Sequence, residues 1–304
     1  MPVKNGQAFL EESMKFLKRN CGEQDEILVI NDNSTDDSLR ILKAWEKTSQ
    51  NVRVISSPKS GLVNALNLGV LNASNAWVAR FDVDDKYPDN RISETRKFIA
   101  ENIVCIFSDY RFTTVSGIDL GIIPTAIGSD LTYLSLVTSQ RTAHSSVCFN
   151  KAAVLDVGGY RNEDFPAEDI SLWLRISRTG SLYSIPEVLL DYRISRNSVS
   201  GRMRGKALAK KGVLVSNFKF DRFVIDRCIT NLDNTKLLYS QELLGNKRYL
   251  LHLRDLYLIN TLPLNLNKNL SAFVRKEIFK SLGLYASAGS LLKELMSRKI
   301  YRSV

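Results

Sequence analysis

Short apolar runs alternate with amphipathic segments along the first third of the chain. Residues 7–19 place apolar side chains three and four positions apart, which predicts a helix. The run Glu26-Ile-Leu-Val-Ile-Asn31 follows, and its unbroken apolar centre is typical of a buried parallel strand. We expect further strands at 52–56, 76–81 and 103–108, and further helices at 61–72 and near 89–101. This alternation predicts an α/β fold, a parallel sheet with helices on both faces.

Another helix is expected directly after the strand at 26–31. Ser34 and Asp37 have the spacing of a capping box, and Leu39, Leu42 and Trp45 form an apolar stripe behind them. For Ser34 and Asp36 we favour helix capping as the role. Asp32 lies too early in the chain for that role, so we interpret it as a ligand contact at the edge of the sheet.

The pattern changes beyond residue 109. Residues 109–200 read as mixed short strands and helices, with an amphipathic helix near 167–178. From about residue 205 the chain is mainly helical, interrupted near Pro263. We therefore expect an α/β domain over residues 1–204 and a basic helical C-terminal region over residues 205–304.

The charge of the chain is unevenly distributed. Residues 1–200 hold 22 Lys and Arg against 25 Asp and Glu, whereas residues 201–304 hold 20 against 7. The net charge of +10 therefore originates in the C-terminal third. Such a region is typical either of a surface that meets anionic phospholipid or of an ordinary solvated helical face.

Four cysteines without metal or disulfide spacing indicate a reduced, cytoplasmic compartment. Two histidines argue against a histidine-rich zinc site. The N-terminus shows no signal-peptide pattern, and no run of about 18 apolar residues is present, so we expect neither secretion nor a membrane span.

The strongest chemical signal is the segment Arg80-Phe-Asp82-Val-Asp84-Asp85, where three carboxylates follow an expected strand. Like charges packed at a strand end destabilise the fold unless a cation lies among them. Carboxylates are the oxygen ligands that Mg²⁺ or Mn²⁺ prefers, often together with substrate phosphates. The alternative is an acidic turn before Pro88. A second acidic pair, Glu168-Asp169, opens a helix, where the helix dipole alone could account for it.

Taken in order, these segments resemble the family 2 glycosyltransferases and their GT-A-type nucleotide-sugar-binding fold, over about residues 1–200. The resemblance rests on an ordered set of motifs: Met1-Pro-Val-Lys-Asn-Gly6, Asn31-Asp32-Asn-Ser-Thr-Asp36, Gly61 through Asn67, Arg80 through Asp85, Gly158-Gly-Tyr-Arg161, Glu168-Asp169 and Asp191-Tyr-Arg193.

The resemblance implies an inverting transferase with a Mn²⁺ or Mg²⁺ cofactor, a nucleotide-sugar donor and a carbohydrate or lipid-linked acceptor in surface-polysaccharide synthesis. It implies donor binding by Asp32, Pro2, Val3, Asp82 and Arg193. Metal binding would fall to Asp84 with Asp82, Asp85 would support them, and Asp169 would be the catalytic base, with Glu168 orienting the acceptor. Arg80 is either a partner of these acids or a ligand.

Three features depart from the family or stay open. Many relatives carry a histidine where this chain has Ser195, which puts a contact to the metal or phosphate in doubt. His144 is either an acceptor-side residue or a hydrogen-bonded structural histidine. Relatives also have a strand before the Pro2-Val3 turn, so we expect the natural reading frame to begin upstream of Met1; a stop codon there would contradict this.

The C-terminal region offers two basic amphipathic stretches. One begins with the cluster Arg202, Arg204, Lys206, Lys210 and Lys211, and the other spans residues 273–301. Basic amphipathic helices bind anionic membranes, which would place the protein at the inner face of the cell membrane. The alternative is a helical bundle that packs on the catalytic domain or on another subunit.

Other classes of protein remain as rivals. A noncatalytic nucleotide- or carbohydrate-binding subunit would keep the fold without turnover. A nucleotidyltransferase would need a glycine-rich basic phosphate loop, and Pro2–Gly6 supplies one lysine and one glycine. A role in nucleic-acid binding has no aromatic platform or recognised motif, so we expect no nucleic-acid partner.

Overall fold

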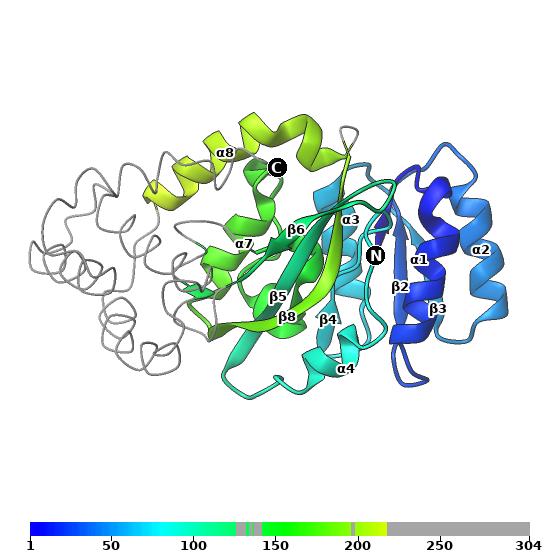
Figure 1. Cartoon of the computed structure of the whole chain (residues 1–304), viewed down its shortest axis with the longest axis horizontal. Helices are drawn as coiled ribbons and strands as arrows, with labels where there is room; N and C mark the ends of the chain where they lie inside the picture. The colour runs from blue at the N-terminus through cyan, green and yellow to red at the C-terminus, as the bar shows by residue number, and fades with distance from the viewer. Residues whose placement is uncertain (126–131, 134–135, 137–141, 196–197, 218–304) are drawn as a thin grey trace, which may run out of the picture. The chain divides into compact units, whose positions relative to one another are not determined.

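Two sheets and the helices around them make up the part of the chain that this computed structural model describes, residues 1–125, 132–133, 136, 142–195 and 198–217. The first sheet is parallel and has the order β1-β2-β3: β1 (Pro2–Val3), β2 (Ile27–Asn31) and β3 (Val52–Ser56). The second sheet is mixed and has the order β4-β7-β5-β6: β4 (Trp77–Ala79), β7 (Cys148–Asn150), β5 (Ile103–Thr114) and β6 (Asp119–Ile123). Strand β8 (Ser181–Ile194) pairs with β5 in parallel (Figure 1).

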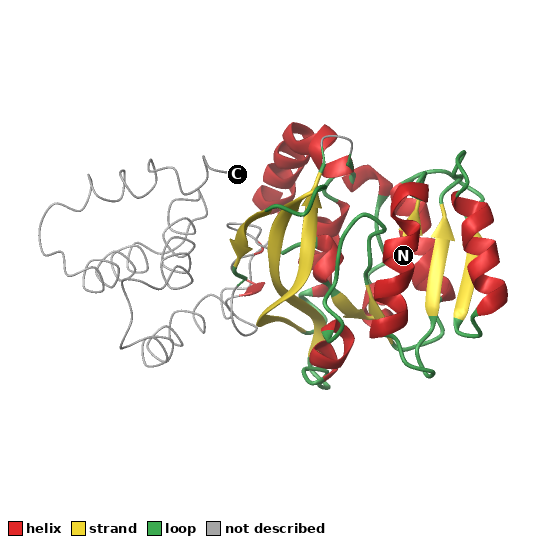
Figure 2. Cartoon of the chain, turned by 45° about the vertical axis from the view of Figure 1, so that its right-hand side comes forward, coloured by secondary structure: helices red, strands yellow, loops and turns green. Residues whose placement is uncertain are grey.

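The helices follow the strands in the chain. They are α1 (Gln7–Asn20), α2 (Ser38–Thr48), α3 (Leu62–Asn72), α4 (Arg91–Arg96), α6 (Lys151–Asp156), α7 (Glu168–Ile176) and α8 (Val199–Asn217), with 3-10 turns η1 (His144–Ser146) and η2 (Asn162–Asp164). Helices α1 and α2 contact each other beside the first sheet, α3 packs against β1 and β2, and α7 packs against α6 and α8 (Figure 2).

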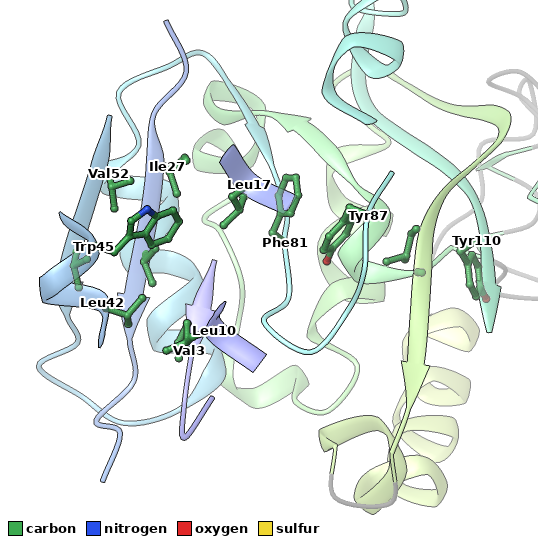
Figure 3. Close-up of a cluster of buried hydrophobic side chains, with 14 residues drawn as sticks. Val3, Leu10, Leu17, Ile27, Leu42, Trp45, Val52, Phe81, Tyr87 and Tyr110 are labelled. Atoms are coloured by element: carbon green, nitrogen blue, oxygen red, sulfur yellow. The ribbon is translucent and has the colours of Figure 1, made fainter. Parts of the chain in front are cut away.

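The core beside the first sheet contains side chains from both helices and strands. Leu10 and Leu17 of α1 and Leu42 and Trp45 of α2 are at most 4% exposed, and they pack with Val29 of β2 (Figure 3). These positions are the apolar stripes that the sequence predicts. Burying one such side chain fully contributes about 1.5–3 kcal/mol, so this cluster fixes the strand ends that carry the candidate site.

The sequence predicted most elements but not all of their pairings. The expected parallel pairing is confirmed for β2 and β3, and the short strand β1 joins them in parallel. The expected parallel strand at 76–81 is wrong in its pairing, because β4 runs antiparallel to β7. The partner strand lies some 70 residues away, so no local pattern specifies it. The helix expected near 89–101 is also shorter, since α4 spans Arg91–Arg96.

The capping box expected at Ser34 and Asp37 is wrong. Helix α2 begins at Ser38, and the amide of Ser38 donates to Asp36 Oδ1 (3.0 Å). The hydroxyl of Ser34 instead accepts from the amide of Asn5 (3.0 Å), which joins the loops after β1 and β2. The N-cap position is occupied by Asp37, and Asp36 lies one residue before it, so neither Ser34 nor Asp36 is the N-cap residue that the sequence predicted.

A cavity of about 170 Å³ lies between β2 and β4. Strand β2 pairs with β3 along its whole length, but with β1 only at Ile30 and Asn31. Beside this short pairing, the Met1 ammonium donates to the carbonyl of Leu28 (2.8 Å). Burial, followed by the charge of Arg80, lowers the pKa of this ammonium to about 5. The edge of β2 that faces the cavity is thus only partly paired.

The described part of the C-terminal region is α8, which continues across residue 204, where we expected a domain boundary. Residues 218–304, including the stretch 273–301 and Cys228, lie outside the described residues. Within the described ranges, no helix combines the length and apolar character needed to cross a bilayer.

Candidate functional site

The loops after β1 and β2 form the first part of the candidate site. Asn5 and Asn33 both have positive φ, 51° and 52°, which asparagine tolerates better than most residues. The side chain of Asn5 accepts from the amide of Thr35 (2.8 Å), and that of Asn33 donates to the carbonyl of Ser57 (3.2 Å). These bonds hold the two loops at the carboxyl ends of neighbouring parallel strands, where ligands collect in such sheets.

Asp32 lies in this corner and is 4% exposed. Its Oδ1 accepts from the amide of Gly61 at the start of α3 (2.8 Å), and its Oδ2 lies 3.6 Å from Lys4 Nζ. The amide of Asp32 donates to the carbonyl of Val3 (2.7 Å). Asp32 is thus not a cap of α2, as the sequence indicated, and Pro2 and Val3 lie on the strand beside it, with the Val3 side chain in the core.

The loop of residues 82–86, which we call the carboxylate loop, follows β4. Asp82 forms an ion pair with the buried Arg80, and its amide donates to Tyr87 Oη (2.7 Å). Asp85 is 4% exposed and accepts from Ser145 Oγ (2.5 Å) and from the amide of Arg193 (2.9 Å). Asp85 therefore ties the loop to η1 and β8.

Asp84 differs from both of these acids. Its carboxylate has no hydrogen bond or ion pair with the side chain of any other residue in the described ranges. Burial, and then the neighbouring charge of Asp82, raise the pKa of Asp84 to about 6. A partly buried carboxylate of this kind favours a cation beside it.

We tested the loop against the ligand preferences of divalent cations. The described residues contain no group of three or more His, Cys, Asp or Glu arranged to hold a metal ion by themselves. Mg²⁺, however, usually takes one or two protein carboxylates and completes its shell with substrate phosphates and water. Asp84 with Asp82 fits this open kind of site and does not fit a closed protein cage.

Arg80 interacts with the carboxylate loop and also with the acidic pair Glu168 and Asp169 at the start of α7. It is 5% exposed; burial opposes its charge, but Asp82 and other neighbours raise its pKa above the ordinary value. Its charge also opposes the effect of burial, which raises the pKa values of Asp84, Glu168 and Asp169. Arg80 is therefore a partner of the acids in this structure, the first of the two roles that its sequence left open.

The second acidic group opens α7. Burial, and then the charge of Asp169, raise the pKa of Glu168 to about 7, and its Oε2 is buried without a hydrogen-bond partner among the described residues. Burial also raises the pKa of Asp169, whose Oδ1 accepts from the amide of Ile170 (2.7 Å). Two acids with raised pKa values at one helix start are typical of functional sites.

A shaped turn positions the helix that carries these acids. Gly159 has φ +65°, and a Cβ there would lie 2.6 Å from the side chain of Asn67. Asn67 accepts from the amide of Tyr160 and donates to its carbonyl, both at 2.8 Å. The hydroxyl of Tyr160 forms a hydrogen bond with His144 Nε2 (2.9 Å), and burial, followed by the charge of Arg80, keeps the pKa of His144 well below 6.5. His144 is thus a neutral, hydrogen-bonded residue.

Arg193 reaches the candidate site from β8. It is 5% exposed, its amide donates to Asp85, and its guanidinium pairs with Glu12 of α1. Sequence reasoning singled out Arg193 but missed Glu12, Ser145 and Tyr87, which the fold brings from other elements. Ser195, where many relatives have a histidine, directly follows the end of β8.

Residues 1–149 match the family model described as glycosyl transferase family 2. An uncharacterized glycosyltransferase of Haemophilus influenzae is 28% identical, over 64% of this chain and 64% of its own length. The chain is also 29% identical to the UDP-Gal:alpha-D-GlcNAc-diphosphoundecaprenol beta-1,3-galactosyltransferase of Escherichia coli, over 66% of this chain and 74% of that one.

Solved structures show the same fold. The crystal structure of S. aureus TarS 1-349 in complex with UDP-GlcNAc superposes with a TM-score of 0.59 and covers 94% of this chain and 91% of that one. The identity is 14%, so this likeness concerns the fold. The GT-A-type sheet expected from the sequence is therefore confirmed.

Proposed function

Because the chain belongs to glycosyl transferase family 2, we propose that it moves a hexosyl or N-acetylhexosaminyl group from a UDP-linked sugar to a carbohydrate or lipid-linked acceptor, with inversion, in the synthesis of lipopolysaccharide O-antigen or capsule. Its coarser role as a glycosyltransferase of polysaccharide biosynthesis follows from the relatives. The observation that carries the proposal is the placement of two acidic groups around Arg80, with Asp84 left without a side-chain partner in the described ranges.

In this proposal the donor nucleotide lies at the carboxyl ends of β1 and β2. The carboxylate of Asp32 accepts from the base, and Lys4, which donates to Ser60 Oγ (2.6 Å), lies 3.6 Å from that carboxylate. Pro2 and Val3 form the adjoining wall. Arg193 would donate to the diphosphate.

Asp84 and Asp82 would hold Mn²⁺ or Mg²⁺ against the diphosphate. When bound there, such an ion would supply Lewis-acid stabilisation for the charge of the leaving diphosphate. When the donor is absent, Arg80 offsets part of the negative charge of the carboxylate loop, since it pairs with Asp82.

Asp169 is the catalytic base in this proposal. The acceptor hydroxyl oxygen attacks the anomeric carbon, the bond from that carbon to the diphosphate oxygen breaks, and the hydroxyl proton passes to the Asp169 carboxylate. One displacement from the opposite face inverts the anomeric centre. Glu168, with its buried unpaired oxygen, orients the acceptor through a hydrogen bond. Holding both substrates in line supplies a further share of the acceleration.

The acceptor is the least constrained part of the proposal. The name of the Escherichia coli relative specifies a diphosphoundecaprenol-linked acceptor for that protein. A lipid-linked acceptor for this chain agrees with the basic C-terminal region, which we propose binds the anionic inner face of the cell membrane.

A panel of UDP-, GDP-, dTDP- and CMP-sugars tests the donor, with Mn²⁺ and with chelator. A true donor at about 100 times its dissociation constant should stabilise the protein by about 2.7 kcal/mol. The variant Asp169→Asn should bind that donor as the wild type does but release UDP about 10²–10⁴-fold more slowly with a panel of sugar acceptors. The exposed Asp156→Asn serves as the control.

Absence of stabilisation by every donor would contradict the proposal. If wild type and Asp169→Asn bound a donor equally and neither released UDP with any acceptor, the chain would instead be a noncatalytic binding subunit.

A further inference from the structure

Three charged side chains meet at the carboxylate loop: Glu12 of α1, Arg193 of β8 and Lys86 of the loop itself. Glu12 of α1 pairs with Arg193 at the end of β8, and its Oε1 lies 2.7 Å from Lys86 Nζ. The Arg193 guanidinium also lies 5.7 Å from the ring centroid of Phe9. Neither the proposed donor site nor the catalytic pair includes Glu12.

Backbone hydrogen bonds hold this cluster against the loop. The amide of Arg193 donates to Asp85 Oδ1 (2.9 Å). The amides of Lys86 and Asp191 donate to each other's carbonyls, at 3.0 and 2.8 Å. These bonds join the backbone at the end of β8 to the carboxylate loop.

Arg193 is electrostatically coupled to Asp84. Burial and Asp82 raise the pKa of the Asp84 carboxyl, whereas Arg80 and Arg193 lower it. A guanidinium that is 5% exposed needs a carboxylate partner, since an unpaired buried charge is strongly destabilising. Both Glu12 and Asp84 are close enough to interact with Arg193, and in this structure Glu12 forms the ion pair.

The pairing with Glu12 has two consequences. Asp84 keeps its oxygens free of side-chain partners within the described ranges. Arg193 Nε is buried without a hydrogen-bond partner there, so the guanidinium keeps a donor available for a ligand.

We propose that Glu12 is a positioning residue that engages Arg193 and thereby leaves Asp84 available to a divalent cation bound together with a nucleoside diphosphate. This inference rests on the proposed function, because the cation and the diphosphate are those of the donor. Without the charge of Glu12, the Arg193 guanidinium loses its ion-pair partner and competes with the cation for Asp84, an acid on which its charge already acts.

A purely structural role for Glu12 makes a different prediction. An ion pair that only braces α1 against β8 would lower the melting temperature on removal and leave the cation dependence of ligand binding unchanged. The cation concentration at half-saturation therefore separates the two roles.

The test titrates Mn²⁺ into the full chain at a fixed concentration of UDP, and in parallel of GDP, and follows binding by calorimetry. In Glu12→Gln the Mn²⁺ concentration at half-saturation should rise about tenfold, the equivalent of one broken charge-assisted contact. Binding of uridine without Mn²⁺ should not change. Glu11→Gln is the matched control, because Glu11 is exposed and pairs with Lys15 on its own helix.

Two further variants keep the test decisive if Glu12→Gln folds poorly. Glu12→Asp retains the carboxylate and should remain near the wild-type Mn²⁺ dependence. In the Arg193→Gln background, Glu12→Gln should add no further shift, because no guanidinium is left to occupy Asp84.

An unchanged Mn²⁺ dependence in Glu12→Gln, or an equal shift in Glu12→Asp and Glu11→Gln, overturns this inference and leaves the proposed function standing. If the wild type binds neither UDP nor GDP at any Mn²⁺ concentration, the proposed function fails and this inference fails with it.

Discussion

The three acids of the carboxylate loop have different environments although they lie within four positions of one another. Asp82 pairs with Arg80, and Asp85 is fully engaged by Ser145 and the backbone of Arg193. Asp84 alone of the three has no such partner in the described ranges. Removal of Asp85 should therefore loosen the loop, whereas removal of Asp84 should act on ligand binding.

The pKa of Glu168 predicts how stability changes with pH. Its pKa is raised from an ordinary 4.5 to about 7, by burial and then by Asp169. Between these values the folded protein holds a proton that the unfolded chain has lost, so the contribution of Glu168 to stability is fully present below about pH 4.5 and is lost as the pH rises through about 7. Glu168→Gln should remove a part of this fall, on the order of 2 kcal/mol.

Denaturant unfolding of the ligand-free protein at about pH 5 and about pH 7 measures this change. Glu101→Gln, at an exposed position, should behave as the wild type does. A Glu168→Gln variant with the full wild-type pH dependence would show that this carboxyl does not hold the proton.

The sequence predicted the candidate acids but not their partners. Asp82, Asp84, Asp169 and Asp32 could be identified because each acid stands at the end of a recognisable strand or the start of a helix. Ser145, which lies 60 positions from Asp85, could not be identified, because only the tertiary fold brings the two together.

At the scale of elements, the sheets show where local pattern is sufficient and where it fails. Strands β2 and β3 are short apolar runs next to each other in the chain, and they pair as the alternation predicts. Strand β4 pairs with β7, which the chain reaches only after β5 and β6, and this order cannot be read from periodicity. The parallel pairing of β5 with β8 likewise joins distant segments.

The cavity between β2 and β4 predicts that added strand structure would stabilise the protein. A four-residue apolar extension, Val-Ser-Val-Ile, fused before Met1 would continue β1 along the incompletely paired edge of β2. One or two buried apolar side chains at about 1.5–3 kcal/mol each, at about 2–4 °C per kcal/mol, should raise the melting temperature by at least about 3 °C.

A Gly-Ser-Gly-Ser extension is the matched control, because it also replaces the buried ammonium of Met1 by an amide. Equal melting temperatures for the two extended proteins would mean that the cavity does not accept a strand.

At the scale of the whole molecule, the charge distribution separates the catalytic region from the C-terminal third. Beyond position 200 the sequence holds 20 basic and 7 acidic residues. In the described part of that region, Arg202 and Lys206 of α8 are exposed, while Lys210 Nζ lies 3.9 Å from Asp164. One of the basic side chains therefore faces the protein, as the bundle alternative expects, and others face outward.

Sedimentation with anionic vesicles tests the membrane proposal. Each basic residue near such a surface contributes about 1 kcal/mol, screened by salt. We expect the protein to pellet with phosphatidylglycerol vesicles at low salt, to be released at high salt and to stay in solution with phosphatidylcholine. Absence from the low-salt pellet would favour the helical bundle.

The account depends most directly on a divalent cation at Asp84. Crystals soaked with Mn²⁺ and UDP should give an anomalous peak for an ion that is coordinated by an oxygen of Asp84 and by the diphosphate, with metal–oxygen distances of about 2.0–2.2 Å. The same soak of Asp84→Ala should lose that peak, while Asp89→Ala, at an exposed acid paired with Arg19, should keep it. A wild-type crystal with UDP bound, no peak at the carboxylate loop and Asp84 turned to solvent would contradict the metal-dependent mechanism.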